Sequence, residues 1–363
     1  MRIIHVVENL NRGGLERVVV DLSREQINMG HQVCIICLYG MGGLANEAID
    51  NGCRVLAVNR KNGVDISALF ILKQLINRFD PDVIHTHNSL CNYFTVLVQA
   101  FNRVPIINTR HGMGEHNKSP KRELLYKVSL IRTSVVIAVC DEARRNFITG
   151  NIVSDKKSLV VKNGIDIHKY STPDLRKVDD LRKKLGIKDD SIVLGSVGRL
   201  VSYKNHLSLV KAVSEVEKNV VLIIVGGGEL YNDILENIKI SGLDDRVMLV
   251  GDQDDVVSYL ALFDIFVMPS VTEGYSLSLL EAFAAHLPVL CTDVGGNTEI
   301  VEDGVNGVII DNSDVVSIRN GIEIIISVNY NAYGIRGYEW VSKFGTTKKV
   351  YSDYMDIYRK VIK

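Results

Sequence analysis

The chain has 363 residues, of which 46% are hydrophobic and 23% charged, and its formal net charge is −1. This composition is typical of a soluble globular protein, and the length suits two domains of ordinary size. No apolar run approaches the ~20 residues of a membrane-spanning helix. Residues 1–7 lack the cleavage site of a signal peptide, and the balanced charge gives no indication of nucleic-acid binding.

The six cysteines are scattered, mostly within strand-like runs. Cys34 and Cys37 form a C-x-x-C by count, but residues three apart in a strand face opposite sides. We therefore expect no redox or zinc site there, and the cysteine usage fits a reducing cytoplasm.

Residues 1–165 alternate short runs rich in Val and Ile with amphipathic segments. Continuous apolar strands between helices predict a parallel sheet buried on both faces. The same alternation resumes at residue 192, after a charged linker at 166–190 with one short helix at 178–185. We therefore predict an α/β protein with two Rossmann-like domains. The strands predicted in the first half are 3–7, 33–38, 55–58, 83–86, 106–109, 135–139 and 159–161.

Polar groups follow several of the first-half strands. Gly13 and Gly14 form a turn before Glu16, where the backbone can approach a ligand, but the G-x-G-x-x-G of a dinucleotide site is absent. His85 and His87 close one strand on the same side, and His111 follows the next strand. We expect no zinc site, because no carboxylate or cysteine accompanies the histidines at ligand spacing.

His111 has two interpretations. It is either a histidine hydrogen-bonded beneath a loop or a polar group directed at a donor sugar. The loop at 111–118 is polar and contains glycine, and we expect it to be mobile until a substrate binds.

In the second half, Gly198 and Arg199 follow the first strand, and Lys204 precedes the next helix. A single Arg or Lys is usually a surface ion-pair partner. Here two cations lie five positions apart at the carboxyl end of a strand, across a turn that contains glycine. A diphosphate requires directional donors and concentrated positive charge, which Arg and Lys supply, so we favour a phosphate site.

Two further glycine turns end second-half strands. Gly227 and Glu229 follow one strand, without the third glycine of a dinucleotide fingerprint. Gly251 follows another, before Asp252 and Asp254, which match a metal-binding D-x-D by count. Such short matches often arise by chance, and the two cations make a metal unnecessary for holding a phosphate.

The stretch 267–298 reads as strand, turn, helix and strand, with the helix beginning near Ser278. Backbone N–H groups at a helix start attract anions, and Ser276 lies there. Glu273 precedes the helix and Glu281 lies in its first turns. By spacing alone, a ligand site and an ordinary capping box from Ser278 to Glu281 are equally supported.

Glu273 and Glu281, followed by Pro288, Gly295-Gly296 and Glu299, resemble the E-x7-E signature of the retaining family-four glycosyltransferases of GT-B fold. The resemblance extends over nearly the whole chain. It implies two Rossmann-like domains with parallel sheets that face an interdomain cleft. The acceptor-side domain is 1–165, the nucleotide-sugar domain is 166–338, and a C-terminal helix at about 339–363 crosses back to the first domain.

One position departs from the family pattern. His286 stands where the family usually has Gly, and a left-handed backbone conformation at a residue other than Gly costs up to ~1 kcal/mol.

The resemblance also implies roles for individual residues. Arg199 and Lys204 hold the diphosphate, Glu281 binds ribose hydroxyls and Glu273 holds sugar hydroxyls near the reacting carbon. The expected catalytic residues are His111, Glu273, Arg199 and Lys204. The donor site is completed by Gly13, Gly14, Gly198, Gly227, Glu229, Gly251, Gly274, Tyr275, Ser276, Leu277 and Glu281. The expected acceptor-side residues are Glu16, His87, Lys121 and Arg122.

The implied reaction moves a hexosyl or N-acetylhexosaminyl group, with retention, from a nucleotide sugar to a lipid-linked saccharide. UDP is the expected nucleotide, no cofactor or metal is expected, and the product belongs to O-antigen, capsule or exopolysaccharide synthesis. Two alternatives remain: a GT-B nucleotide-sugar epimerase or hydrolase, and a non-catalytic nucleotide-sugar-binding subunit.

Charge is divided unevenly along the chain. Residues 1–165 contain 21 Lys and Arg against 14 Asp and Glu, a net charge of +7, and the remainder carries −8. In the segment 118–127, basic residues flank Leu124, Leu125 and Tyr126, which we expect to be exposed. Each basic residue near an anionic leaflet contributes ~1 kcal/mol. We therefore predict a cytoplasmic protein attached peripherally to the inner face of the plasma membrane, with the anionic membrane surface as a partner.

Overall fold

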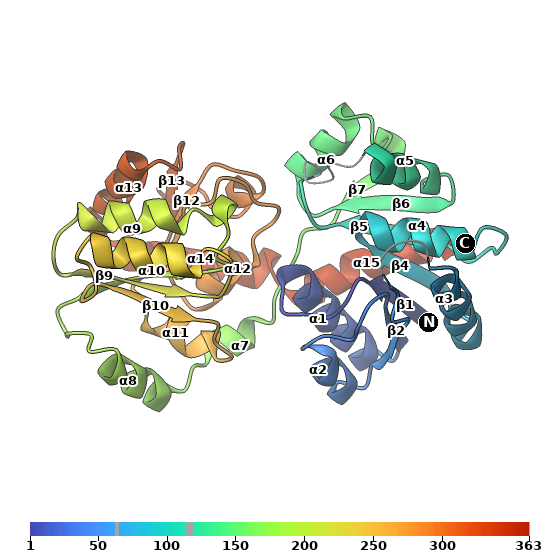
Figure 1. Ribbon diagram of the computed structural model, residues 1–363, viewed down its shortest axis with the longest axis horizontal. Helices are drawn as coiled ribbons and strands as arrows, with labels where there is room; N and C mark the ends of the chain where they lie inside the picture. The colour runs from blue at the N-terminus through green and yellow to red at the C-terminus, as the bar shows by residue number, and fades with distance from the viewer. Residues whose placement is uncertain (62–64, 114–119, 363) are drawn as a thin grey trace. The chain divides into compact units, whose positions relative to one another are not determined.

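The computed structural model describes residues 1–61, 65–113 and 120–362 (Figure 1). Most of the loop that we expected to be mobile, residues 114–118, lies outside the described residues. No helix among those described is long and apolar enough to cross a bilayer.

The chain forms two compact units. The first consists of residues 1–165 and 347–363, and the second of residues 166–346. In each unit the described strands pair in parallel within one sheet. The α/β class with two parallel sheets is therefore confirmed.

The sheet of the first unit has the strand order β3-β2-β1-β4-β5-β6-β7. Helices α3 and α4 pack on one face, and α1, α2 and α15 pack on the other, so the strands are buried on both sides (Figure 1). The elements are β1 (Arg2–Val7), α1 (Gly14–Asn28), β2 (Gln32–Cys37), α2 (Ala45–Asp50), β3 (Arg54–Ala57), α3 (Ile66–Phe79), β4 (Val83–His87), α4 (Asn88–Val98), β5 (Ile106–Arg110), α5 (Pro120–Ser129), β6 (Thr133–Ala138), α6 (Asp141–Thr149), η1 (Asp155–Lys157), β7 (Ser158–Val160) and α15 (Thr347–Ile362).

The sheet of the second unit has the equivalent order β10-β9-β8-β11-β12-β13. Helices α9, α10 and α13 share its main apolar cluster, and α12 packs against α14 outside that cluster. The elements are α7 (Ile167–Ser171), α8 (Leu175–Lys184), β8 (Ile192–Val197), η2 (Ser202–Lys204), α9 (His206–Ser214), β9 (Val220–Val225), α10 (Tyr231–Ile240), β10 (Val247–Gly251), α11 (Val256–Leu262), β11 (Ile265–Met268), α12 (Leu277–Ala284), β12 (Val289–Thr292), η3 (Asn297–Glu299), β13 (Gly307–Ile310), α13 (Val315–Ser327) and α14 (Tyr330–Phe344).

Strand order reverses at one place in each sheet, between β1 and β4 in the first unit and between β8 and β11 in the second. At such a reversal the loops after the two strands diverge, and ligands of open α/β sheets bind there. This places the residues after β8 and β11 at the expected ligand site of the second unit.

The C-terminal segment differs from the single helix predicted from about residue 339. Helix α14 ends before Gly345 and remains in the second unit, whereas α15 begins at Thr347 in the first. A Cβ at Gly345 would lie 2.7 Å from Val341 Cγ2, so a larger residue in this close turn would require the valine side chain to shift. The chain therefore passes between the units at 346–347, not at 338–339. The linker also holds two helices, α7 and α8, where one was predicted.

His286 adopts the left-handed conformation expected of the glycine that it replaces, with φ of 59°. Its ring stacks on Tyr338, with the ring centroids 3.9 Å apart. This stacking contact offsets part of the backbone cost of ~1 kcal/mol.

Candidate active site

Two loops that leave the second sheet at its reversal point meet in an ion pair. Lys204 follows β8 and Glu273 follows β11, and Lys204 Nζ lies 2.5 Å from Glu273 Oε1. The same oxygen accepts a hydrogen bond from Ser270 Oγ at 2.6 Å. The two charged side chains are 16% and 10% exposed, so the pair is mostly buried. The structure thus joins two residues to which the sequence assigned separate ligands, the diphosphate and the sugar.

Arg199 lies on the same loop as Lys204 but in different surroundings. Its side chain is exposed, and Nη2 donates a hydrogen bond to Tyr203 OH at 2.6 Å. The backbone of Tyr203 ties this loop to the one after β11, because its carbonyl oxygen accepts from Val271 N at 2.8 Å. The loop therefore presents one exposed guanidinium and one buried ammonium, which together suit a diphosphate.

Glycines allow the loops after β8, β9 and β10 to touch. A Cβ at Gly226, where φ is 141°, would lie 2.0 Å from the carbonyl oxygen of Gly198. Leu200 N donates to Gly227 O at 2.8 Å, and Gly226 N donates to Gly251 O at 2.9 Å. The three predicted glycine positions therefore belong to one continuous backbone surface at the carboxyl edge of the sheet.

The acidic residues of these turns are exposed and do not join the ion pair. Glu229, Asp252 and Asp254 all have exposed side chains. Within the residues that the structure describes, three or more potential metal ligands come together only in the first unit. The D-x-D match is therefore not part of a larger ligand cluster.

Helix α12 begins at the site, but its cap differs from the sequence interpretation. Ser276 is the N-cap residue, and its Oγ accepts a hydrogen bond from Leu279 N at 3.4 Å. The capping box from Ser278 is therefore wrong. Glu281 Oε1 instead accepts a hydrogen bond from the hydroxyl of Tyr170 on α7, at 2.7 Å. Tyr170 is buried and fixes the carboxylate one turn inside the helix.

The turn before α12 packs against a second glycine pair. Gly296 N donates to Gly274 O at 2.7 Å. A Cβ at Gly295, where φ is 58°, would lie 1.9 Å from the carbonyl oxygen that precedes Gly274, so the close approach requires glycine. Tyr275 is buried in this turn, and Leu277 is the first residue of α12.

In the first unit, Gly13 is the N-cap of α1 and Gly14 its first residue. Glu16 folds back over this turn, because a Cβ on Gly13 would lie 2.4 Å from Glu16 Oε2. Lys121 and Arg122 are exposed on α5.

Two of the predicted histidines, His87 and His111, form a hydrogen-bonded line with His5, which the sequence did not single out. His5 Nδ1 lies 3.0 Å from His87 Nε2, and His87 Nδ1 lies 3.0 Å from His111 Nε2. Burial lowers the pKa of His5 to about 4 and that of His111 to about 3. His87 is 1% exposed and both its nitrogens contact other histidines. His87, expected on the acceptor side, is therefore buried, and both of its ring nitrogens have histidine partners.

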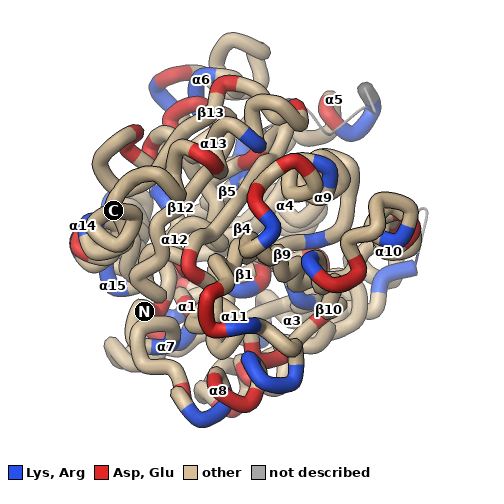
Figure 2. Tube along the Cα trace, turned by 90° about the vertical axis from the view of Figure 1, so that its left-hand side faces the viewer, with Lys and Arg blue, Asp and Glu red and all other residues tan. Residues whose placement is uncertain are grey.

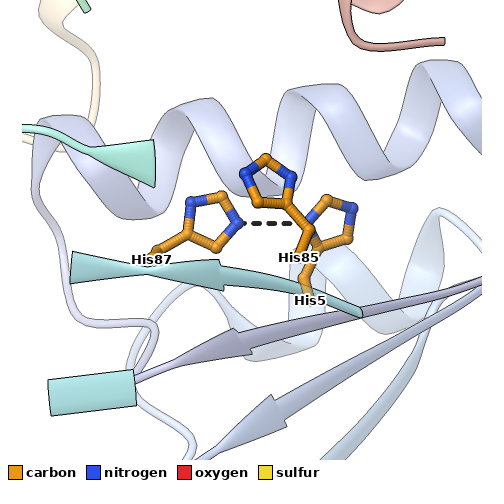
Figure 3. A group of neighbouring side chains, drawn as sticks. All are labelled: His5, His85 and His87. Carbon is orange, nitrogen blue, oxygen red and sulfur yellow. Dashed lines mark hydrogen bonds between the residues drawn. The ribbon is translucent and has the colours of Figure 1, made fainter. Parts of the chain in front are cut away.

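His5, His85 and His87 offer nitrogens within 4.8 Å of one another, which is the kind of group that can hold a metal (Figure 3). The nitrogens of His85 already lie 2.7 Å from Tyr358 OH and 2.7 Å from Thr109 Oγ1. His5 and His87 share a hydrogen bond, drawn as the dashed line in Figure 3. These contacts favour a hydrogen-bonded cluster over a metal site.

Sequence reasoning missed several polar residues near these sites. Glu8 directly follows β1, and Ser270 lies two residues after β11, so the rule that ligands gather at strand ends applied to both. Burial raises the pKa of the Glu8 carboxyl, against the lowering effect of nearby Arg122 and Arg60. His5 lies inside a strand, and its role depends on strand neighbours that no local pattern reveals.

Known families match both halves of the chain. The model described as Glycosyl transferases group 1 matches residues 177–339, and that described as Glycosyltransferase Family 4 matches residues 12–169. The chain is 29% identical to the UDP-Gal:alpha-D-GlcNAc-diphosphoundecaprenol alpha-1,3-galactosyltransferase of Escherichia coli, over 97% of each chain. It is 25% identical to the N-acetyl-alpha-D-glucosaminyl L-malate synthase of Bacillus anthracis, over 97% of this chain and 95% of that one.

A solved structure agrees with the fold. The HepE protein of Anabaena, in complex with UDP and glucose, superposes with a TM-score of 0.88 at 20% identity, over 98% of this chain and 99% of that one. One explanation accounts for the two parallel α/β units, for the E-x7-E pair at a strand reversal and for the two family models that together span both units. The chain belongs to the glycosyl transferases of group 1 and family four, adopts the GT-B fold, and is a glycosyltransferase.

Proposed function

We propose that the protein is a retaining glycosyltransferase that moves a hexosyl or N-acetylhexosaminyl group from a UDP sugar to a lipid-linked saccharide in surface-polysaccharide assembly. The observation that carries the proposal is the Lys204–Glu273 pair at the strand reversal, with Arg199 on the same loop. The Escherichia coli relative is named for a UDP-galactose donor and a diphosphoundecaprenol-linked acceptor, and HepE binds UDP.

The cations act on the leaving group. Departure of a nucleoside diphosphate builds negative charge on the phosphate oxygen that leaves the sugar, and preorganised positive groups stabilise that charge. Arg199 supplies a guanidinium fork, Lys204 an ammonium group, and the first N–H groups of α12 a partial positive charge. No metal is needed in this scheme, because the two cationic side chains neutralise the charge of the diphosphate.

The carboxylates act on hydroxyl groups. A bound diphosphate attracts Lys204 away from Glu273, whose oxygens then accept hydrogen bonds from the donor sugar. Glu281, oriented by Tyr170, accepts from the ribose. Each carboxylate thus acts as an acceptor whose position is set by a neighbouring side chain.

The test is a product assay with a panel of nucleotide sugars and undecaprenyl-diphosphate-linked acceptors, read by mass spectrometry and anomeric NMR. We expect transfer with the anomeric configuration of the donor preserved, and undiminished activity in EDTA. An inverted product would contradict the retaining mechanism, and loss of activity in EDTA that Mg²⁺ restores would contradict metal independence.

The same assay separates the rival functions. Donor hydrolysis or epimerisation without acceptor would identify a hydrolase or epimerase. UDP-sugar binding without turnover would identify a binding subunit. Transfer to L-malate, the acceptor in the name of the Bacillus anthracis relative, would replace the lipid-linked acceptor by a small soluble one.

We further propose that α5 docks on an anionic bilayer. Leu124, Leu125 and Val128 on α5 are 63%, 51% and 56% exposed, and Ile131 just beyond it is 81% exposed. Tyr126, expected to be exposed, is instead fully buried in the core. Helix α4, which contacts α5, exposes Leu97, and Phe101 just beyond α4 is also exposed.

Positive charge accompanies this surface. Lys121, Arg122 and Lys127 are exposed on α5. Figure 2 colours the Lys and Arg positions of this helix blue. The first unit as a whole contains 26 Lys and Arg against 16 Asp and Glu, a net charge of +10. Exposed apolar side chains among basic ones suit insertion into an anionic interface.

Sedimentation with anionic vesicles tests the docking. We expect binding at low salt, release at high salt, and weaker binding of Lys121→Glu/Arg122→Glu and of Leu124→Ser/Leu125→Ser. The matched control Lys183→Glu/Lys184→Glu makes the same charge change on exposed residues of α8 and should bind as the wild type does. Equal binding to neutral and anionic vesicles, or equal loss in the control, would contradict the docking surface.

A further inference from the structure

An unbroken line of hydrogen bonds runs from helix α1 to the carboxyl edge of the first sheet. Gln26 Oε1 lies 2.9 Å from His5 Nε2, His5 Nδ1 lies 3.0 Å from His87 Nε2, and His87 Nδ1 lies 3.0 Å from His111 Nε2. Gln26, His5 and His87 are each at most 1% exposed. The line therefore crosses β1 and β4 beneath the surface and ends just after β5. Figure 3 shows its central link, between His5 and His87.

The three imidazoles are neutral at physiological pH. Burial lowers the pKa of His5 to about 4 and that of His111 to about 3, and it lowers the pKa of His87 well below its ordinary value. A neutral imidazole has one N–H donor and one bare acceptor nitrogen. Each link of the line then needs one proton, so fixing the proton at one end fixes every other link.

Gln26 fixes the position of the proton at the α1 end of the line. Its carbonyl oxygen can only accept, so His5 carries its proton on Nε2 and accepts on Nδ1 from His87. His87 then accepts on Nδ1 from His111 Nε2–H, which leaves His111 Nδ1 without a proton. An amide turned by 180° would place its N–H against His5 and reverse every link.

One hydrogen bond sets the orientation of the Gln26 amide. Its oxygen lies 2.9 Å from His5 Nε2, whereas Gln26 Nε2 is buried and makes no hydrogen bond with any described residue. The contact with His5 is therefore what places the amide oxygen at the start of the line.

The far end of the line lacks a partner. His111 Nδ1 is buried and makes no hydrogen bond with any described residue. We propose that Gln26, His5 and His87 are positioning residues that hold His111 in the tautomer with an unprotonated Nδ1, which accepts a hydrogen bond from a hydroxyl group of the sugar substrate. This inference rests on the function proposed above.

The tautomer itself can be observed without any substrate. In the full chain labelled with ¹⁵N-histidine at pH 7.5, with assignments from His5→Gln and His111→Gln, we expect His5, His87 and His111 all protonated on Nε2 only. A proton on His111 Nδ1, or an imidazolium at His111, would overturn the inference. Because the spectrum needs no turnover, this result is independent of whether the proposed transferase activity is found.

A variant at the start of the line tests the coupling. Gln26→Met keeps the side-chain volume but removes the acceptor, so His111 should populate both tautomers and kcat should fall ~10-fold. UDP affinity by calorimetry should not change. Ser23→Ala, on the same helix and equally buried, should alter neither tautomer nor kcat. An unchanged His111 tautomer in folded Gln26→Met would refute the coupling between Gln26 and His111. If that variant fails to fold, the wild-type spectrum still shows whether His111 Nδ1 is unprotonated.

Discussion

Arg199 and Lys204 carry the same charge on one loop but have different partners. Lys204→Met leaves the Glu273 carboxylate unpaired at 10% exposure. We expect turnover to fall ~10²-fold or more and the free energy of unfolding to fall by ~2 kcal/mol. Arg199 is exposed, so Arg199→Met should lower turnover similarly while changing stability by less than ~0.5 kcal/mol. Steady-state kinetics and urea unfolding measure both quantities.

The double variant Lys204→Met/Glu273→Gln is the control for this prediction. It removes both charges, so it should regain most of the lost stability without regaining activity. A Lys204→Met protein as stable as the wild type would show that the pair contributes nothing to folding. Near-normal turnover in both single variants would contradict the diphosphate role.

At the scale of elements, the loops after β8 and β9 are held in contact by glycine. Gly226→Ala places a methyl group 2.0 Å from Gly198 O, at a φ of 141° that other residues rarely adopt. We expect the loops to separate, with a loss of ~2 kcal/mol in stability. The affinity for UDP should fall ~10-fold or more, because Arg199 and Lys204 lie on the displaced loop. Calorimetry and thermal unfolding provide the measurements.

Gly242→Ala is the matched control, because Gly242 also has positive φ, 61°, but no atom lies within 4 Å of its added Cβ. Only the backbone cost of ~1 kcal/mol remains there. UDP affinity should therefore be unchanged. Equal UDP affinities in the Gly226 and Gly242 variants would mean that close loop contact does not shape the donor site.

At the scale of the whole molecule, buried histidines couple folding to pH. Burial lowers the pKa values of His5 and His206 to about 4 and that of His111 to about 3. The unfolded values are ~6.5, so the unfolded chain binds more protons as the pH falls below that value. Stability is therefore complete above about pH 6.5 and is lost progressively toward pH 4. We expect Tm to fall steeply between pH 6.5 and 5 and to stay nearly constant between pH 8 and 7.

Circular dichroism at constant ionic strength measures the profile. His206→Gln should flatten it, because one buried histidine then no longer takes up a proton on unfolding. His168→Asn, a change on the exposed surface of α7, should leave it unchanged. A Tm that does not vary from pH 7.5 to 5 would show that these histidines do not control stability.

The sequence by itself determined the fold class, and it indicated the candidate donor-site residues. Apolar runs of three to six residues between amphipathic segments specify buried parallel strands. The carboxyl ends of such strands are where ligands bind. Arg199, Lys204 and Glu273 lie in the loops after β8 and β11, so a local pattern was sufficient to propose them as site residues.

Tertiary structure decided which of these residues meet. Lys204 and Glu273 are 69 positions apart, and they touch because β8 pairs with β11, an order that no local pattern encodes. Tertiary packing also decided three other features: the position of Gln26 beside His5, the burial of Tyr126, and the passage of the chain between the units after α14. Local spacing fixes which face of an element a side chain occupies. The contacts of that side chain depend on which other elements pack against the face. That packing is decided only when distant segments bury their apolar surfaces together.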